Sequence, residues 1–388
     1  MKKQKFALVL SGGGFKGAFQ VGALNYLREN WNQIFPEAGP MHFDIIAGVS
    51  VGALNGVMLA MNKEKELNEL WELIARNGVE EVYTSPFIDT KAQGEEPKFS
   101  FNAEVLKEQF LPDFQVKAKL LDGVKMLFSK KARQKFIEKT MEDAASSIGS
   151  HIANFRNIAD NTPLYEKLKK TVDREAITDC QYFCGFVSLD DGAYSSVSSE
   201  RFIDNKDLIK GILASTAIPI VWNPVPDIRT ADKRIRNSVD GGIRNNSPLG
   251  DVIRAIEDDP EDNVEYTVVI INCGTGSIRE QDFSRSNIFE IALRSLEEIT
   301  LSEIFNNDIK HFMRINELVC QAKAAGVEVF KEQDCPLQEF KSLLIQPADD
   351  ILGNMLCANE ALIRLRMKHG RQKAEEAVNA FAGNGVPA

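Results

Sequence analysis

The chain has 388 residues, 44% of them hydrophobic and 26% charged, and it carries a formal net charge of −10 at pH 7. A chain of this length and composition can bury a large core, and it shows no internal repeat or low-complexity tract. No stretch approaches the roughly 18 consecutive apolar residues of a membrane-spanning helix, so the composition excludes fibrous, disordered and membrane-spanning classes.

The first predicted strand covers residues 5–10 and runs directly into a glycine-rich turn, SGGGFKG at residues 11–17, which a stretch of helical periodicity follows. Three consecutive glycines between a strand and a helix leave backbone N–H groups that can point at an anion. The pattern indicates an oxyanion hole at Gly12, Gly13 and Gly14. The lysine-rich start imitates a secretory signal, but its apolar run of about five residues is too short, so we expect a cytoplasmic protein.

The same turn also matches the dinucleotide-binding pattern G-x-G-x-x-G at Gly12, Gly14 and Gly17. That pattern further requires an acidic residue about 20 positions on, at the end of the second strand. Here the second strand has Asp44 near its start and ends in glycine, valine and Ser50. A nucleotide site is therefore disfavoured, although a non-catalytic module that holds a phosphate or nucleotide in the glycine loop remains an alternative.

The second predicted strand, residues 43–47, leads into GVSVG at residues 48–52, and a helix-like segment starts at once. A G-x-S-x-G motif between a strand and a helix is typical of a nucleophile elbow. Gly48 and Gly52 permit the tight turn, and the dipole of the following helix points at the hydroxyl. Ser50 is therefore the candidate nucleophile.

A serine nucleophile needs a base, and the chain has only four histidines, His42, His151, His311 and His369. The order Ser50, Asp240, His311 would reproduce an α/β-hydrolase triad. His311 lies in the middle of a helical pattern, however, and a helix-surface position is expected for it. A soluble carboxylesterase with this triad stays open as an alternative.

Asp240 is the stronger candidate for the base. It ends a strand-like run, and Gly241 and Gly242 after it permit a tight loop. An aspartate at its reference pKa of about 3.9 is a weak base, but partial burial raises that pKa and a direct hydrogen bond to the serine compensates for a modest mismatch.

Together these motifs resemble the patatin-like phospholipase family, which carries G-G-G-x-[RK]-G, G-x-S-x-G and D-G-[GA] in this order. The matches here are GGGFKG at residues 12–17, GVSVG at 48–52 and DGG at 240–242. Two further segments are similar to the family, ASTAIP at residues 214–219 and GTG at 274–276.

The resemblance implies a phospholipase A-type lipid acyl hydrolase with a Ser50–Asp240 dyad and no metal or cofactor. It places Lys16 at the basic position of the first motif, where it either orients the loop or meets a lipid phosphate. The expected substrate is a phospholipid or another acyl-ester lipid, and no nucleic-acid partner is expected.

Strands that alternate with helices predict an α/β fold, a three-layer α/β/α sandwich around a mainly parallel sheet. We expect one catalytic domain over residues 1–388 because the motifs are spread along most of the chain. Residues 85–175 read as a helical cap insertion. Residues 281–388 read as mostly helical, with one strand near 342–346, and they either complete the domain or form a regulatory or oligomerisation surface.

Within the expected cap, the stretch from Lys117 to Lys139 holds eight basic and two acidic residues. Its apolar residues follow helical spacing, which is typical of a segment that docks on an anionic membrane. A solvated cap helix is the alternative. The six cysteines show no metal-ligand spacing and are expected to be reduced thiols.

Overall fold

The computed structural model describes residues 3–89, 100–101, 157–275, 278, 280–286, 288–332, 335–348 and 350–383. Most of the expected cap, and the whole stretch from Lys117 to Lys139, lies outside the described residues. The cap and its membrane contact therefore stay predictions.

An eight-stranded sheet forms the centre of the molecule, with the order β12-β9-β1-β2-β5-β8-β7 and with β6 paired to β5. The strands are β1 (Lys3–Leu10), β2 (Ile45–Val49), β5 (Gln181–Ser188), β6 (Tyr194–Ser198), β7 (Val225–Arg229), β8 (Arg234–Asp240), β9 (Val264–Ile271) and β12 (Lys341–Ile345). Strands β12, β9, β1, β2 and β5 run parallel to one another, and β6, β7 and β8 pair antiparallel. Two short antiparallel strand pairs lie apart from the sheet, β3 (Ile88–Asp89) with β4 (Ser100–Phe101), and β10 (Phe330–Glu332) with β11 (Cys335–Pro336).

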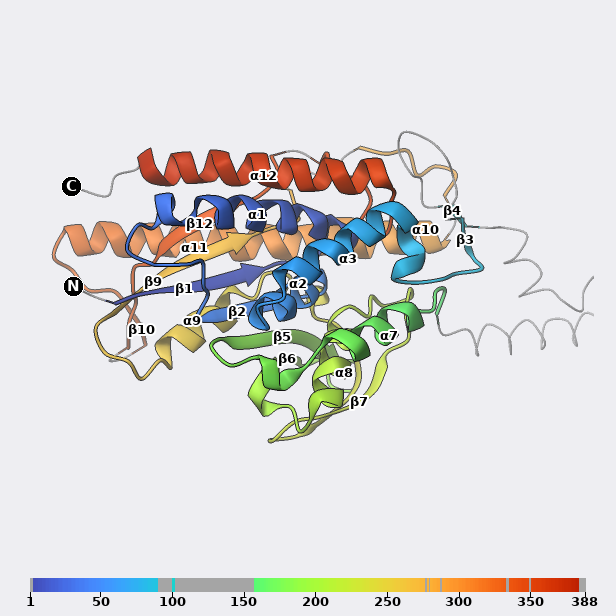
Figure 1. The fold of residues 1–388 in the computed structure, drawn as a ribbon, viewed down its shortest axis with the longest axis horizontal. Coiled ribbons are helices and arrows are strands. Elements are labelled where there is room, and N and C mark those ends of the chain that lie inside the picture. The colour runs from blue at the N-terminus through green and yellow to red at the C-terminus, as the bar shows by residue number, and fades with distance from the viewer. Residues whose placement is uncertain are drawn as a thin grey trace, which may run out of the picture.

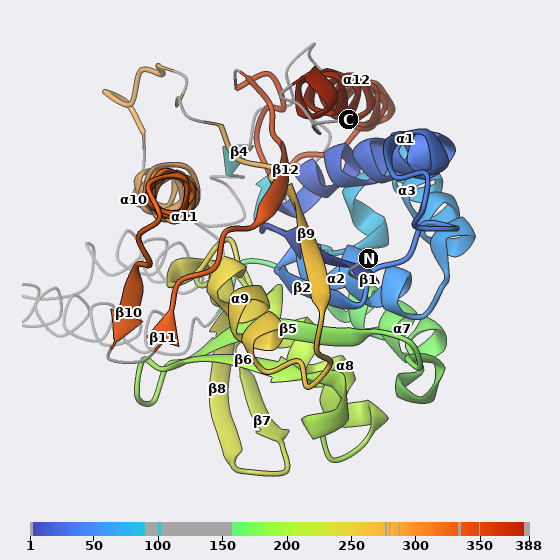
Figure 2. The same cartoon turned by 90° about the vertical axis from the view of Figure 1, so that its left-hand side faces the viewer.

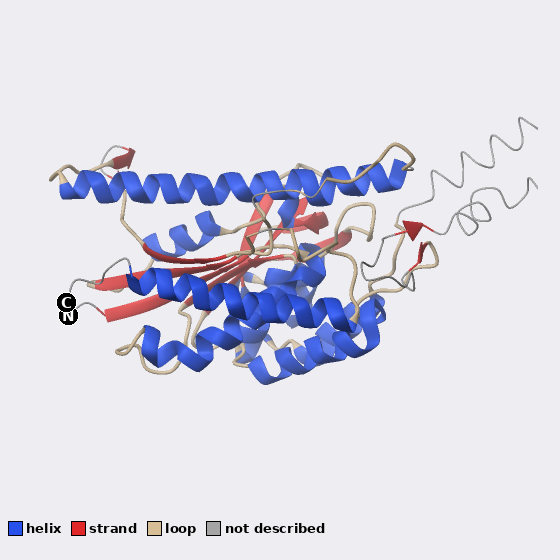
Figure 3. Cartoon of the chain, turned by 90° about the horizontal axis from the view of Figure 1, so that it is seen from above, coloured by secondary structure: helices blue, strands red, loops and turns tan. Residues whose placement is uncertain are grey.

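Helices cover both faces of this sheet. The α-helices are α1 (Gly17–Ile34), α2 (Val51–Ala60), α3 (Glu64–Asn77), α7 (Thr162–Thr171), α8 (Asn205–Ser215), α9 (Leu249–Glu257), α10 (Ile288–Leu293), α11 (Leu301–Ala324) and α12 (Glu360–Gly383). Short helical turns are η1 (Gly14–Lys16), η2 (Gly78–Glu81), η3 (Arg174–Ala176), η4 (Ser199–Arg201), η5 (Gly241–Ile243) and the π-helical η6 (Arg294–Thr300). Figure 1 shows the helices along the sheet, and Figure 3 shows the strands enclosed between them.

Alternate residues of β1 belong to two different apolar clusters, one on each face of the sheet. Phe6, Leu8 and Leu10 join the larger apolar cluster with α1, α2, α3 and α12, whereas Ala7 and Val9 join a second cluster with α9 and α11. Side chains alternate across a strand, so one continuous apolar run supplies both faces. Figure 2 shows α9 and α11 on one side of the sheet and α1 and α12 on the other. The three-layer α/β/α fold with a mainly parallel sheet is confirmed.

The C-terminal part contributes to both the sheet and its cover. The strand expected near 342–346 is β12, which pairs in parallel with β9 at the edge of the sheet. Helix α12 packs on α1 through Gly22 and Gly370, each of which leaves no room for a β-carbon against the backbone of the facing helix. Within the described part of the chain, no helix is long and apolar enough to cross a membrane.

Candidate active site

Ser50 lies at a strained turn between β2 and α2. Its backbone has φ 55° and ψ −127°, a region that a residue with a β-carbon rarely adopts. A β-carbon on Gly48 would collide with the backbone of Gly52, and one on Gly52 would collide with the carbonyl of Leu10. The two motif glycines are thus required by the close packing of this elbow. Gly17 is required for a similar reason, because it packs against the side chain of Val51.

Strand β5 brings the serine and the aspartate together. In the strand register, Val49 lies opposite Gly185, and Asp240 lies opposite the next residue of β5, Phe186. Strand β6 pairs with β5 across both of these positions, so β2 and β8 share the other edge of β5. Because β8 runs antiparallel to β5 and β2 runs parallel to it, the carboxyl ends of β2 and β8 meet.

Asp240 is buried and held by several hydrogen bonds. Its Oδ1 accepts from the amide of Gly242 at 2.8 Å, and its own amide donates to the carbonyl of Ala217 at 3.0 Å. Burial raises the pKa of Asp240 to about 7, while hydrogen bonds to its carboxylate from Gly242 and from the Ser50 side chain lower it in part. A buried carboxylate with this pKa beside a serine can act as a general base near neutral pH.

Ser215, the last residue of α8, stabilises the turn at Ser50 through its side chain. Its hydroxyl accepts from the Ser50 amide at 2.9 Å and donates to the carbonyl of Gly185 at 2.6 Å. The segment 214–219, identified only as a weak family similarity, therefore contacts both Ser50 and Asp240, the latter through Ala217. The sequence motif located this segment, but the hydrogen bonds that Ser215 and Ala217 make depend on the tertiary fold.

The glycine-rich turn lies beside Ser50. Gly13 has φ 156° and Gly14 has φ 53°. In the described part of the chain, the amides of Gly13, Gly14 and Val51 have no hydrogen-bond acceptor, and Val51 begins helix α2. The amide of Gly12, by contrast, donates to the carbonyl of Asn246 at 3.2 Å. The amides of Gly13 and Gly14 are therefore available to bind an oxyanion, whereas the amide of Gly12 bonds the turn to the loop after Asp240.

Gly241 and Gly242 follow Asp240 with little room around them. A β-carbon on Gly241 would lie 2.5 Å from the carbonyl of Gly185, and one on Gly242 would lie 2.9 Å from Oδ1 of Asn246. Both glycines thus allow the loop to pack against β5 and against the residue that anchors Gly12.

Lys16 does not line the cavity at Ser50. Its Nζ lies 3.5 Å from Oδ1 of Asp350, and burial lowers its pKa while Asp350 opposes that shift. The side chain borders a small polar hollow behind the glycine turn, outside the cavity at Ser50. Of the two roles expected for Lys16, this pairing favours orientation of the loop.

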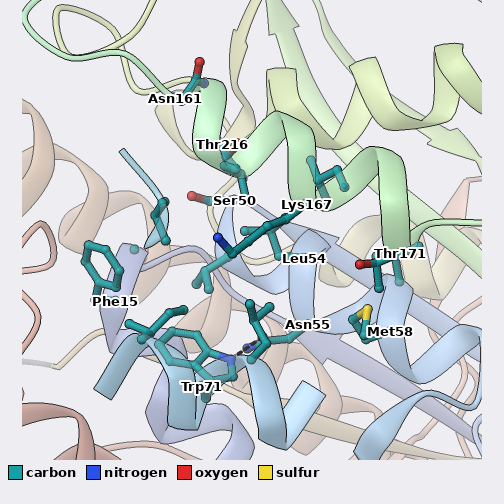
Figure 4. Close-up of a pocket in the computed structure, with 18 of the residues that line it drawn as sticks. Phe15, Ser50, Leu54, Asn55, Met58, Trp71, Asn161, Lys167, Thr171 and Thr216 are labelled. Carbon is teal, nitrogen blue, oxygen red and sulfur yellow. Dashed lines mark hydrogen bonds between the residues drawn. The ribbon is translucent and has the colours of Figure 1, made fainter. Parts of the chain in front are cut away.

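Ser50 opens into a cavity of about 520 Å³ between α2, α3 and α7. Its walls are mostly apolar and include Phe15, Leu54, Met58, Leu70, Trp71, Ile74, Leu164, Leu168, Val172, Ile218 and Trp222. Figure 4 shows Ser50 among these side chains. Lys167 also lines the cavity, and its Nζ lies 2.6 Å from Oε2 of Glu81. A cavity of this size and polarity suits a flexible hydrocarbon chain.

The family model of patatin-like phospholipases matches residues 8–253, more than half of the chain and all three of its glycine motifs. The chain belongs to the patatin-like phospholipase family. Among solved structures, the crystal structure of VipD from Legionella pneumophila is similar at 13% identity, over 98% of this chain and 67% of that one, with a TM-score of 0.37. No curated protein matches the sequence. Family membership makes this patatin-like phospholipase a lipid hydrolase in the broad sense.

The three histidines that the structure describes in this patatin-like phospholipase, His42, His311 and His369, do not line the cavity at Ser50. His311 is exposed on α11, as expected for a helix surface, and there it opposes the rise that burial causes in the pKa of Asp308, to about 6. This placement gives no support to a triad through His311.

The cysteines that the structure describes with their side chains are free thiols, Cys180, Cys184, Cys273, Cys320 and Cys357. Burial raises the pKa of Cys180 and of Cys273 to about 12, so both remain protonated at neutral pH. Among the described residues, no group of three or more His, Cys, Asp or Glu side chains is placed to hold a metal ion.

Proposed function

We propose that this protein is a phospholipase A-type hydrolase that cleaves ester-linked fatty acids through a Ser50–Asp240 dyad. The observation that carries the proposal is the junction on β5 where β2 and β8 end against neighbouring residues, which brings Ser50, at its strained elbow, beside the buried Asp240. The apolar cavity that opens at Ser50 supports an acyl chain as the bound group.

In this mechanism the Ser50 hydroxyl attacks the ester carbonyl while Asp240 accepts its proton. The negative oxygen of the tetrahedral intermediate is stabilised by the amides of Gly13 and Gly14, with that of Val51 at the positive end of α2. Each such donor contributes roughly 3 kcal/mol in comparable sites. The leaving alcohol then takes the proton from Asp240.

The acyl group stays on Ser50 until water displaces it. Asp240, again a carboxylate, accepts a proton from that water, whose oxygen forms the new bond to the acyl carbon. When the bond to Ser50 breaks, the proton returns to the serine oxygen and a fatty acid leaves. The dyad performs both steps without a metal or a cofactor.

The test is fatty-acid release from mixed anionic phospholipid vesicles by the wild type, Ser50→Ala, Asp240→Asn and His311→Ala. We expect wild-type release with His311→Ala and a loss of at least about 10³-fold in the two dyad variants. Release that survives Ser50→Ala would contradict the proposal. Ser50-dependent cleavage of soluble short-chain esters alone would indicate an esterase, and inactivity on both would favour a phosphate-binding module.

Peripheral membrane contact through the basic stretch from Lys117 to Lys139 remains part of the proposal, as does a cytoplasmic location. Each basic residue near an anionic surface contributes about 1 kcal/mol to binding. Replacing Lys130 and Lys131 together by glutamate should weaken sedimentation with anionic vesicles and leave the cleavage of a soluble ester unchanged. Equal sedimentation of the two proteins would remove this segment from the proposal.

A further inference from the structure

The glycine-rich turn rests on a loop from the opposite end of the chain. The amide of Phe15 donates to the carbonyl of Met355 at 2.8 Å, and a β-carbon on Gly14 would lie 2.5 Å from that same oxygen. Lys16 pairs with Asp350 at the start of this loop. The backbone that presents the Gly13 and Gly14 amides is therefore packed directly on residues 350–357, between β12 and α12.

Arg366 of α12 fixes the conformation of this loop. Its side chain is fully buried. The guanidinium donates through Nε to the carbonyl of Leu352 at 2.8 Å, through Nη1 to that of Cys357 at 2.9 Å and through Nη2 to that of Asn354 at 2.8 Å. A planar guanidinium presents its donors in a rigid fork, so three carbonyls of one loop are held at once. An ammonium group has no such fixed arrangement.

The same loop also forms part of the cavity wall. Met355 and Leu356 line the cavity beside Gly14 and Phe15. The carbonyl of Leu356 accepts from the hydroxyl of the buried Tyr83 at 2.9 Å. Residues 350–357 thus contact both the glycine-rich turn and the cavity into which Ser50 opens.

We propose that Arg366 is a positioning residue for the oxyanion hole, acting through residues 352–357. It holds the carbonyl of Met355 where that oxygen fixes the Phe15 amide, and this contact aims the Gly13 and Gly14 amides at the reacting carbonyl. Both Arg366 and the loop lie beyond residue 253, where the family match ends. The inference rests on the proposed Ser50–Asp240 function.

The experiment measures kcat and KM of the purified full chain on a soluble p-nitrophenyl ester, with the midpoint of thermal unfolding recorded for each variant. Arg366→Lys keeps a long basic side chain but loses the planar fork of donors. Asn354→Ala is a milder variant, because it removes only the side-chain amide group whose oxygen accepts from the Leu356 backbone amide at 2.8 Å. Arg364→Gln is the matched control on the same helix, since it removes exposed ion pairs with Glu72 and Glu360 and touches no part of the loop.

We expect Arg366→Lys to lower kcat by about 10- to 100-fold with KM changed less than about twofold, because a misplaced oxyanion donor acts on the transition state. Asn354→Ala should change kcat in the same direction by a smaller factor, and Arg364→Gln should match the wild type. Active-site titration with a fluorophosphonate should show an unchanged fraction of reactive Ser50.

Two results would overturn the inference. One is a folded Arg366→Lys or Asn354→Ala protein with wild-type kcat. The other is a loss of activity that matches the loss of titratable serine, since Arg366 would then act only on folding. A wild type that cleaves no ester would instead reject the proposed function, and the two failures are therefore distinguishable.

Discussion

In the proposed mechanism, Asp240 sets the pH response of the site. Burial raises its pKa to about 7, and only the ionised carboxylate can accept the proton of Ser50. We therefore expect kcat/KM for a soluble ester to rise about tenfold per pH unit below pH 7 and to level off above it. A pH–rate profile measures this, and a plateau that extends down to pH 5 would show that Asp240 is not the base.

The same shift predicts how Asp240 affects stability. Its folded-state pKa lies above the ordinary value of 3.8, so the folded chain binds more protons than the unfolded chain between about pH 4 and pH 7. The contribution of Asp240 to the free energy of unfolding therefore falls as the pH rises through this window, by up to about 4 kcal/mol. Asp240→Asn should be inactive, yet more stable than the wild type at pH 8.

Urea unfolding of both proteins at pH 5 and pH 8 isolates this effect, because the other carboxylates cancel in the difference. We expect the stability gain of Asp240→Asn to be larger at pH 8 than at pH 5. An equal difference at the two pH values would mean that Asp240 titrates near its ordinary pKa.

Ser50 stores strain in its backbone, which the φ of 55° shows. Such a conformation costs on the order of 1–3 kcal/mol for a residue with a β-carbon and little for glycine. Ser50→Ala and Ser50→Gly should both be inactive. Ser50→Gly should be the more stable of the two by about 1 kcal/mol in urea unfolding, and equal stability would show that the elbow is unstrained.

At the scale of elements, β5 is the part that organises the site, because β2 and β8 end against neighbouring residues on one of its edges. Ser215 of α8 stabilises this junction, because its hydroxyl accepts from the Ser50 amide and donates to the carbonyl of Gly185. Without the Ser215 hydroxyl, the buried Ser50 amide and the buried Gly185 carbonyl would both lack this hydrogen bond, which costs about 1–3 kcal/mol of stability. Displacement of the elbow should act on kcat more than on KM.

Ser215→Ala should therefore lower both the free energy of unfolding and kcat. Ser238→Ala is a suitable control, because Ser238 is also a buried serine, on β8, whose hydroxyl has no partner in the described part of the chain. Similar losses in the two variants would indicate a general packing effect and would contradict the specific role of Ser215.

The sequence predicts the elements that carry local patterns. The buried strands, Ser50 with its flanking glycines and Asp240 with its two glycines follow from short-range rules, since each turn needs those residue types. The strand near 342–346 was also predictable from its apolar run. Ser215, the contact between Gly12 and Asn246, and Arg366 were not, because the partner of each is a backbone group distant in sequence that only the tertiary fold brings near.

At the scale of the whole molecule, the fold extends past the family match. Strand β9 lies between β1 and β12, so residues after 253 supply both an inner strand and an edge strand of the sheet. Helix α12 lies along α1, which begins directly after the glycine-rich turn. The C-terminal part thus supplies strands and a covering helix to the sandwich, and one domain over residues 1–388 stays a prediction.

The contact between α1 and α12 depends on glycine at the crossing point. A β-carbon at Gly370 would collide with the carbonyl of Phe19, and backbone atoms cannot move aside as a flexible side chain can. Helix propensity alone favours alanine over glycine by about 1 kcal/mol inside a helix. Because overpacking against backbone costs about 1–3 kcal/mol or more, we expect Gly370→Ala to destabilise the protein.

Gly250 in α9 provides the matched control, because a β-carbon there would meet nothing within 4 Å. Gly250→Ala should raise the free energy of unfolding by about 0.5–1 kcal/mol through helix propensity alone. In urea unfolding, the change from glycine to alanine should therefore lower the free energy of unfolding at position 370 and raise it at position 250. A stabilising Gly370→Ala would mean that α12 does not pack closely on α1, and the proposed role of Arg366 in positioning the glycine-rich turn would lose its support.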